Sequence, residues 1–259
     1  MFKFGENWAS FSRSIDETRM EEAKQSLKKL FGEGVLSGKS FLDIGCGSGL
    51  FSIAAAQLGA RSVLGLDVDP VSVATSQHNA AHWLKSPSSI SFRQLSVLDG
   101  ELMNKLGTFD IVYSWGVLHH TGNMKMALRN AVQRVAPHGM LMIAIYNKHW
   151  SSGVWKVIKW MYNRVGSWGQ KILIWILTPV IFLAKWLVTF QNPLKMERGM
   201  QFMHNVVDWV GGYPYEYASI AEMRAALENT GFEVLAVFPA KVPTGCNEFV
   251  CRKRAASDG

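Results

Sequence analysis

The stretch FLDIGCGSGLFSIAAAQLGARSVLGLDVDP, residues 41–70, decides the fold of this 259-residue chain. It begins with a short apolar run, Phe41–Ile44, of the kind that forms a buried strand. A glycine-rich turn at 45–49 follows, and Leu50–Leu58 then has the apolar spacing of a helix. A second apolar run, Ser62–Leu66, comes next. This order predicts a βαβ unit of a parallel sheet.

The glycine turn and the carboxylate after the second run together predict a nucleotide-cofactor site. Glycines let backbone N–H groups approach a ligand closely, and the helix N-terminus that follows favours an anionic group. Asp67 stands about 20 residues after Gly45, where a doubly wound sheet places a carboxylate that binds ribose hydroxyls. The dinucleotide fingerprint would need a glycine where Leu50 stands. Taken alone, a glycine loop can also be no more than a tight turn from strand to helix.

With Asp43 before the loop and Asp67 after it, the stretch resembles motif I and the next acidic residue of class I S-adenosylmethionine (SAM) methyltransferases. The resemblance implies that the loop glycines pass close to the methionine part of SAM and that Asp67 holds the ribose. The full set of cofactor contacts that it implies is Asp43, Gly45, Cys46, Gly47, Gly49, Asp67, Val68, Ser96, Val97, Ser114 and Trp115.

Further apolar runs agree with this family's fold. The expected strands after the first two are Ile90–Leu95, Phe109–Trp115, Met140–Tyr146, Glu233–Phe238 and Glu248–Cys251. Strands that alternate with helical stretches predict an α/β architecture, here a Rossmann-like, seven-stranded, mostly parallel sheet with helices on both faces. The expected divisions are an N-terminal helical lid (1–38), a SAM-binding core (39–147), a helical apolar and basic insert with an acceptor-side loop (148–216), and the completion of the sheet (217–259).

The insert after the fifth expected strand has an unusual composition. Between Asn147 and Met200, eight Lys and Arg residues stand against the single acidic residue Glu197, so the chain's formal net charge of +7 lies in this part of the insert. It also holds six of the ten tryptophans. Within it, Ile172–Phe190 is almost continuously apolar, and Pro179 is expected to divide this run into halves.

Three roles for the insert stay open: a helical lid on the domain or at a dimer interface, a membrane-docking surface, or a nucleic-acid-binding region. Docking through 154–190 is supported by Val154–Tyr162, which carries Lys156 and Lys159 on an apolar, tryptophan-containing helix. A single membrane span is excluded by the expected fold, because the strands after the insert must join the sheet formed before it. Nucleic-acid binding is disfavoured because the cations are spaced among bulky aliphatic residues instead of clustered.

Candidate acceptor-side residues lie in four separate segments. A general base is needed if the acceptor is a phenol, an alcohol or an activated carbon. The candidates for that role are His119, Tyr213 and Glu216, and those for acceptor binding are Trp8, His120, Asn147 and Tyr215. Each has a structural alternative: Trp8 as an anchor of the N-terminus, the histidines as helix caps, and the loop at 210–217 as a turn.

Longer similarities extend beyond the core. The segments FxFGxNW, FLDIGCGSGLFS, YSWGVLHHTG, AIYN and DWxGGYPYE resemble a bacterial subgroup often labelled benzoquinol-methylase-like. Ubiquinone-type O-methyltransferases often have a histidine at the position of His120, and some use acidic metal ligands around it. Gly116 and His119 stand at the matching acidic positions, so no metal is expected.

The function expected from these observations is SAM-dependent methyl transfer to a small, apolar or lipid-like acceptor, with O- or C-methylation favoured. The alternatives are a non-catalytic SAM-binding module anchored at a membrane, or an RNA methyltransferase, for which the N/D-P-P-[FY/W] motif is missing after strand four. Three cysteines without zinc spacing indicate a reducing compartment, and the charged N-terminus has no apolar signal core. A cytoplasmic protein is expected, in contact with the inner face of a membrane if the insert docks there; the sequence leaves the oligomeric state open.

Overall fold

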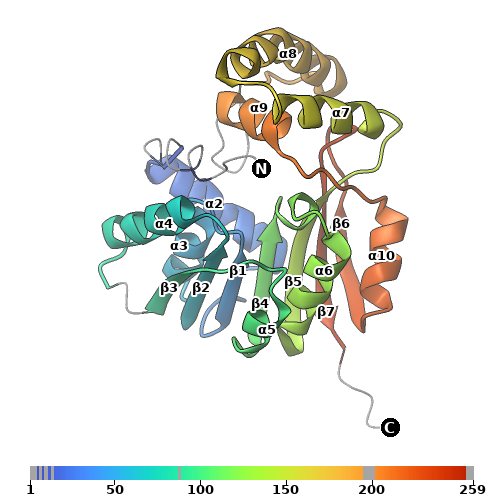
Figure 1. Ribbon diagram of the computed structural model, residues 1–259. Coiled ribbons are helices and arrows are strands. Elements are labelled where there is room, and N and C mark those ends of the chain that lie inside the picture. The colour runs from blue at the N-terminus through green and yellow to red at the C-terminus, as the bar shows by residue number, and fades with distance from the viewer. Residues whose placement is uncertain are drawn as a thin grey trace.

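The computed structural model describes residues 5, 8, 11, 12, 15–86, 89–194 and 202–254. Seven strands form one sheet in the order β3-β2-β1-β4-β5-β7-β6 (Figure 1). Their bounds are β1 Ser40–Ile44, β2 Ser62–Asp67, β3 Ile90–Gln94, β4 Phe109–Trp115, β5 Val135–Tyr146, β6 Phe232–Phe238 and β7 Cys246–Lys253. The first five strands are parallel, and β7 runs antiparallel to both β5 and β6. The predicted seven-stranded, mostly parallel sheet is confirmed.

Helices cover both faces of this sheet, as Figure 1 shows. One face packs against α2 (Glu17–Phe31), α3 (Leu50–Gln57) and α4 (Pro70–Trp83). The other packs against α5 (Gly100–Asn104), α6 (Met124–Gln133) and α10 (Ile220–Glu228), with the short 3₁₀ helix η2 (Leu118–His120) at the end of β4. Burying both faces explains why the central strands are runs of apolar residues without alternation.

The strand order reverses beside β1, because the chain moves outward through β2 and β3 and then returns to β4 on the other side. Ligands of open α/β sheets bind at such a switch point, in the crevice outside the carboxyl ends of the strands. The glycine turn after β1 and the end of β4 both lie at this point.

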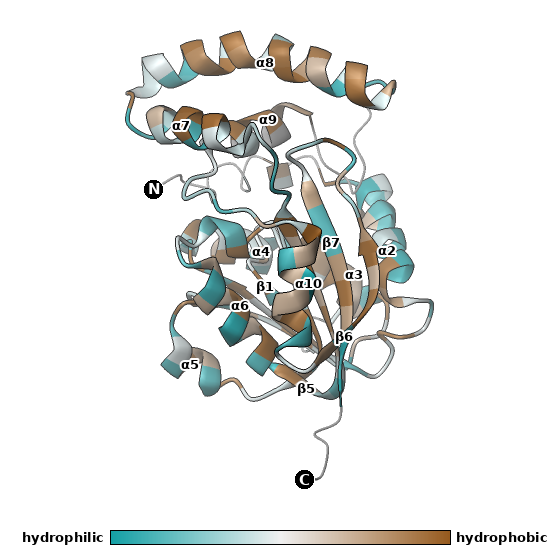
Figure 2. Cartoon of the chain, turned by 90° about the vertical axis from the view of Figure 1, so that its right-hand side faces the viewer, coloured by the Kyte–Doolittle hydropathy of each residue, from teal (hydrophilic) through white to brown (hydrophobic). Residues whose placement is uncertain are grey.

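The described residues of the insert fold as three helices above the carboxyl ends of the strands: α7 (Ser152–Tyr162), α8 (Ser167–Thr189) and α9 (Phe202–Gly211). They share a small core of their own, built on Tyr162, Phe202, Val206 and Val210. Figure 2 shows α8 lying across the top of the molecule above α7 and α9, with hydrophobic residues along most of its length.

Two expected boundaries differ from the structure. The prediction that Pro179 divides the apolar run was wrong, because α8 is one helix of 23 residues with this proline inside it. A proline inside a helix removes one backbone hydrogen bond. Here the helix continues on both sides of the proline in spite of the missing bond. The fifth strand begins at Val135 instead of Met140, so it also includes residues 135–139 before the expected start.

Candidate cofactor and acceptor site

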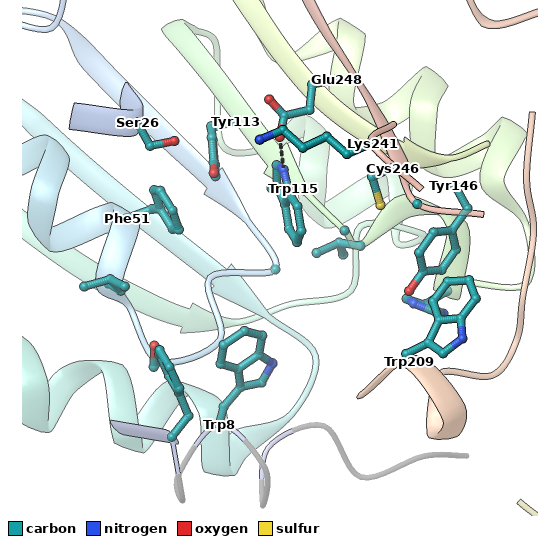
Figure 3. A pocket seen from close by; sticks show the side chains of 18 of the residues that line it. Trp8, Ser26, Phe51, Tyr113, Trp115, Tyr146, Trp209, Lys241, Cys246 and Glu248 are labelled. Atoms are coloured by element: carbon teal, nitrogen blue, oxygen red, sulfur yellow. Dashed lines mark hydrogen bonds between the residues drawn. The ribbon is translucent and has the colours of Figure 1, made fainter. Parts of the chain in front are cut away.

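A cavity of about 2170 Å³ lies at the carboxyl edge of the sheet, between the core and the insert. Figure 3 shows side chains from the N-terminal segment, the sheet and α9 around it. The predicted site residues that line it are Trp8, Asp43, Gly45, Cys46, Asp67, Val68, Ser96, Val97, Trp115 and His120. Segments far apart in the sequence therefore meet in one site.

The glycine turn is tied to the end of β2 through backbone groups. The N–H groups of Gly45 and Cys46 donate to the Leu66 carbonyl at 2.7 and 2.9 Å, and that of Gly47 donates to Asp67 Oδ2 at 3.0 Å. Gly45 has φ +78°, and a Cβ there would lie 2.3 Å from Val117 Cγ2. Both its conformation and its close contact with Val117 require glycine at this position.

Two carboxylates stand at the ends of β1 and β2. Asp67 accepts backbone N–H groups on both oxygens, from Gly47 and, at 2.9 Å, from Asp69, and burial raises its pKa. Asp43 is fully buried and accepts the Ser52 hydroxyl at 2.6 Å. Burial, and secondarily the charge of Asp67, raise the pKa of Asp43 to about 7.

This pair fits the SAM that the sequence predicts. SAM carries a sulfonium and an ammonium, and a cation beside buried carboxylates favours their charged form. Each oxygen of Asp67 retains a second lone-pair position that ribose hydroxyls can use. Gly45 and Cys46 line the cavity with the two carboxylates, whereas Gly47 and Gly49 are not part of its lining.

The described residues of the N-terminal segment cover the cofactor end. The Trp8 ring lies so close to Gly47 that a Cβ there would be 3.0 Å from it, and it meets Phe11 edge-on at 5.6 Å between ring centroids. The Gly5 N–H donates to Asp69 Oδ2 at 2.9 Å. These contacts support the predicted lid position of Trp8.

The end of β3 supplies the neighbouring wall, where the resemblance places the adenine. Ser96 and Val97 both line the cavity. The Val97 carbonyl accepts the Asn130 side-chain amide at 2.7 Å, which fixes the backbone at this point. Val68, half exposed, lines the cavity beyond Asp67.

The predicted bases do not reach the cavity. The Glu216 carboxylate accepts the Met124 N–H, with its closer oxygen at 3.0 Å, and so caps α6. His119 is fully buried against the Tyr146 ring, with 3.9 Å between ring centroids, and burial lowers its pKa well below the usual range. Tyr213 lies in the loop after α9 and is not part of the cavity wall. These placements favour structural roles for all three residues.

Three further predicted contacts also lie outside the cavity wall. The Ser114 hydroxyl donates to the Ile44 carbonyl at 3.0 Å, and Ser114 is fully buried. The Asn147 amide donates to the Pro243 carbonyl at 2.8 Å. Tyr215 is buried, and burial raises its pKa to about 12. None of the three lines the cavity.

His120 does line the cavity, as a neutral side chain. Its Nδ1 lies 2.8 Å from the Pro214 carbonyl. A carbonyl can only accept, so Nδ1 carries the proton and Nε2 carries the lone pair. Burial, and secondarily the charge of Lys159, lower the pKa of His120 to about 3. His120 therefore lines the cavity as an uncharged side chain at neutral pH.

Lys159 has a different position from the one the sequence indicated. The pattern of α7 suggested a cation at a membrane surface, but Lys159 is fully buried. Its ammonium lies 4.0 Å from the centroid of Trp209, 4.8 Å from Tyr215 and 5.5 Å from Tyr146, and it donates to the Trp209 carbonyl. Tyr146 and Trp209 also line the cavity and form an aromatic wall of it. The ammonium of Lys159 packs against this aromatic wall.

Sequence reasoning missed several cavity residues on the acceptor side. These are Tyr146, Trp155 and Trp209 from the aromatic wall, and Glu248 from β7. Glu248 accepts the Trp115 indole N–H at 2.7 Å. Its position two residues after Cys246 in an expected strand gave no sign that it would meet a side chain from β4.

Comparison with known proteins identifies the family of the chain. A methyltransferase domain family model matches residues 15–237. Two ubiquinone biosynthesis O-methyltransferases of Rhodopseudomonas palustris are each 30% identical to the chain: that of strain BisB5 over 62% of this chain and 61% of its own length, and that of strain BisB18 over 71% and 72%. The chain thus spans roughly two thirds of the length of these relatives.

Solved structures share the fold. Magnesium protoporphyrin IX methyltransferase from Synechocystis PCC 6803 matches with a TM-score of 0.56 and 16% identity, over 90% of this chain and 79% of its own. An O-methyltransferase family protein from Burkholderia thailandensis matches with a TM-score of 0.56 and 12% identity, over 92% and 58%. The chain belongs to the methyltransferase domain family, as a class I SAM-dependent methyltransferase.

Proposed function

We propose that the protein transfers the methyl group of SAM to a small lipophilic acceptor, at an oxygen or a carbon. The observation that carries this proposal is the continuity of the cavity, which joins the cofactor end to an apolar region beneath the insert. The inner surface of α8 contributes Ile181, Ala184 and Val188 to that region. The similarity to ubiquinone biosynthesis O-methyltransferases supports the same class of acceptor.

The chain contributes to such a reaction mainly by alignment. SAM supplies an electrophilic methyl group when it is bound. Asp67 and the Gly45 turn orient the cofactor, Trp8 covers it, and the aromatic wall of Tyr146 and Trp209 positions a flat acceptor. Holding two reactants in line and excluding water can account for most of a methyltransferase's acceleration.

The test is turnover of a defined series of acceptors. Purified protein is incubated with SAM and phenols whose alkyl chains increase in length, and the masses of the products are measured by mass spectrometry. We expect a gain of one methylene unit, with KM falling as the chain lengthens. The variant Trp209→Ala should raise KM for the long-chain phenols most, while Trp150→Ala, an exposed tryptophan outside the cavity wall, serves as control. Tight SAM binding without turnover of lipophilic acceptors would contradict the proposal.

We also propose that the insert contacts a membrane from its cytoplasmic side. The described chain has one helix, α8, that is long and apolar enough to cross a bilayer. It lies on the surface instead: Trp168 is 80% exposed and Trp175 79% exposed. The strands before and after it share one sheet, so both ends of α8 stay on the same side.

An apolar helix with tryptophans and cations at its surface is typical of proteins that dock in the headgroup layer. Docking would place the apolar end of the cavity next to the lipid, where a lipophilic acceptor is concentrated. Lys156 and Lys171 are exposed on α7 and α8, which favours anionic lipid.

Liposome flotation tests this contact. We expect the protein to float with vesicles of phosphatidylcholine and phosphatidylglycerol, and less with phosphatidylcholine alone. Replacing Trp168 and Trp175 by Ser should abolish flotation, whereas Leu102→Ser, at an exposed apolar position on α5, should not change it. Absence of flotation with both lipid mixtures would rule the contact out.

A further inference from the structure

One acidic side chain of the cavity, that of Glu248, lies on β7, outside the stretch that forms the cofactor turn. The strand register places it: Trp115 on β4 pairs with Ala144 on β5, and Ala144 pairs with Glu248 on β7. Side chains of paired residues on neighbouring strands point to the same face of the sheet. The small Ala144 between them leaves room for the indole of Trp115 to reach across to the Glu248 carboxylate.

The same row of paired residues across the sheet extends toward the cofactor turn. On β1, Asp43 pairs with Tyr113 of β4, two residues before Trp115, and β4 lies between β1 and β5 in the sheet. Trp115 therefore stands between the cofactor turn and Glu248. Figure 3 shows Trp115 and Glu248 joined by their hydrogen bond at the edge of the cavity, with Lys241 beside them.

The other carboxylates of the described cavity wall lie around the cofactor turn or on α2. Asp43 accepts the Ser52 hydroxyl of α3, Asp67 accepts an N–H of the cofactor turn, and Asp69 accepts the Gly5 N–H of the N-terminal segment. Those on α2 are Glu17, Glu21 and Glu22, which are all exposed. Glu248 is half-buried on the acceptor side of Trp115. It combines a carboxylate, a fixed orientation and access to the cavity.

We propose that Glu248 is the general base that takes the proton from a hydroxyl acceptor, which makes the favoured substrate a phenol. This inference rests on the proposed methyl transfer. As the acceptor attacks, its O–H bond breaks and the proton bonds to a Glu248 oxygen. The electron pair on the acceptor oxygen forms the new bond to the methyl carbon, and the pair of the broken carbon–sulfur bond stays on sulfur. The Trp115 N–H holds the carboxylate toward the incoming hydroxyl.

The variant Glu248→Gln tests this role, because the amide oxygen can still accept the Trp115 N–H but cannot take a proton. Two acceptors are compared: catechol, whose hydroxyls are protonated at neutral pH, and 4-nitrocatechol, whose nitro group makes one hydroxyl ionise near neutral pH. We expect kcat for catechol to fall about 10²- to 10⁴-fold, the usual effect of losing a general base. For 4-nitrocatechol at pH 8 we expect a loss of less than about tenfold, because no proton has to be removed.

Two controls separate a chemical from a structural effect. Glu233→Gln changes an exposed glutamate on the neighbouring strand β6 and should leave both rates unchanged. Calorimetry with S-adenosylhomocysteine, which cannot react, should give the wild-type Kd for Glu248→Gln, which shows an intact cofactor end.

The outcomes distinguish the two proposals. Equal losses on both catechols, or no loss on either, would overturn the role of Glu248 while methyl transfer stands. If the wild type binds S-adenosylhomocysteine but methylates neither catechol nor any longer phenol, O-methylation itself is overturned and Glu248 has no such role.

Discussion

The two ends of the cavity are built in different ways. The cofactor end is built mainly on one continuous stretch, 41–70, in which the backbone N–H groups of Gly45 and Gly47 bond to the end of β2. The acceptor end is assembled from side chains of β4, β5, β7, α7 and α9, which are far apart in the sequence. Local geometry determines the first end, whereas the second depends on how distant elements pack. The two ends should therefore respond differently to substitution.

The largest expected effect is at the cofactor end. Gly45→Ala adds a Cβ to a residue at φ +78°, 2.3 Å from Val117 Cγ2. A left-handed conformation costs about 1–2 kcal/mol for a non-glycine residue, and overpacking costs about 1–3 kcal/mol more. We expect the free energy of unfolding in urea to fall by about 2–5 kcal/mol and SAM binding to be lost.

Gly107→Ala is the matched control for this change. Gly107 has φ +76°, but no atom lies within 4 Å of its added Cβ, so this variant carries the conformational cost alone. It should lose about 1–2 kcal/mol and keep its affinity for SAM. Equal destabilisation of the two variants would show that the close contact with Val117 contributes nothing to the loss of stability in Gly45→Ala.

The same contrast explains what could be predicted from the sequence. The strand, the glycine turn and Asp67 are close in sequence, so their spacing alone predicted the βαβ unit and the cofactor carboxylate. Glu248 could not be found in this way, because its meeting with Trp115 depends on the antiparallel pairing of β7 with β5 and on the small Ala144 between them. Glu216 was selected for its place in a polar loop, yet its carboxylate caps α6.

Lys159 shows a further reason why the role of a side chain cannot be predicted from a sequence pattern alone. Lys156 and Lys159 lie on the same apolar helix, and composition alone gave them the same role. The rotation of α7 exposes Lys156 and buries Lys159 against Trp209 and Tyr215. That rotation is set by the docking of the insert on the core, which is a property of the whole fold.

A substitution at the acceptor end should leave the cofactor end intact. Lys159→Met removes a hydrogen bond from a charged donor to the Trp209 carbonyl and the cation–π contacts of the ammonium. We expect a loss of about 2 kcal/mol in the free energy of unfolding and a higher KM for the acceptor, with an unchanged Kd for SAM. Lys156→Met, exposed on the same helix, should change none of these quantities. A weaker SAM affinity in Lys159→Met would show that the two ends are coupled.

The smallest expected effect is the pH dependence of SAM binding, which comes from Asp43. Its pKa is about 7 in the free protein, above the ordinary value of 3.8, because burial and the charge of Asp67 favour the protonated form. A cationic ligand favours the carboxylate and lowers this pKa, so by linkage SAM affinity rises with pH and levels off above about 7. Between pH 8 and pH 6 we expect the Kd to rise about tenfold. In Asp43→Asn, SAM affinity should be lower and lose this component of its pH dependence.

Two measurements on the wild type and Asp43→Asn isolate the contribution of Asp43 to this pH dependence. The ratio of the two Kd values at each pH cancels the titration of SAM itself, so only the contribution of Asp43 remains. The free energy of unfolding without ligand depends on pH in the opposite direction. Between pH 3.8 and about 7 the folded protein holds a proton on Asp43 that the unfolded chain has lost, so the stability of the protein falls as pH rises. Urea unfolding should show this decline in the wild type and a shallower one in Asp43→Asn. A constant Kd ratio from pH 6 to 8 would mean that the charge of Asp43 does not contribute to holding the cofactor.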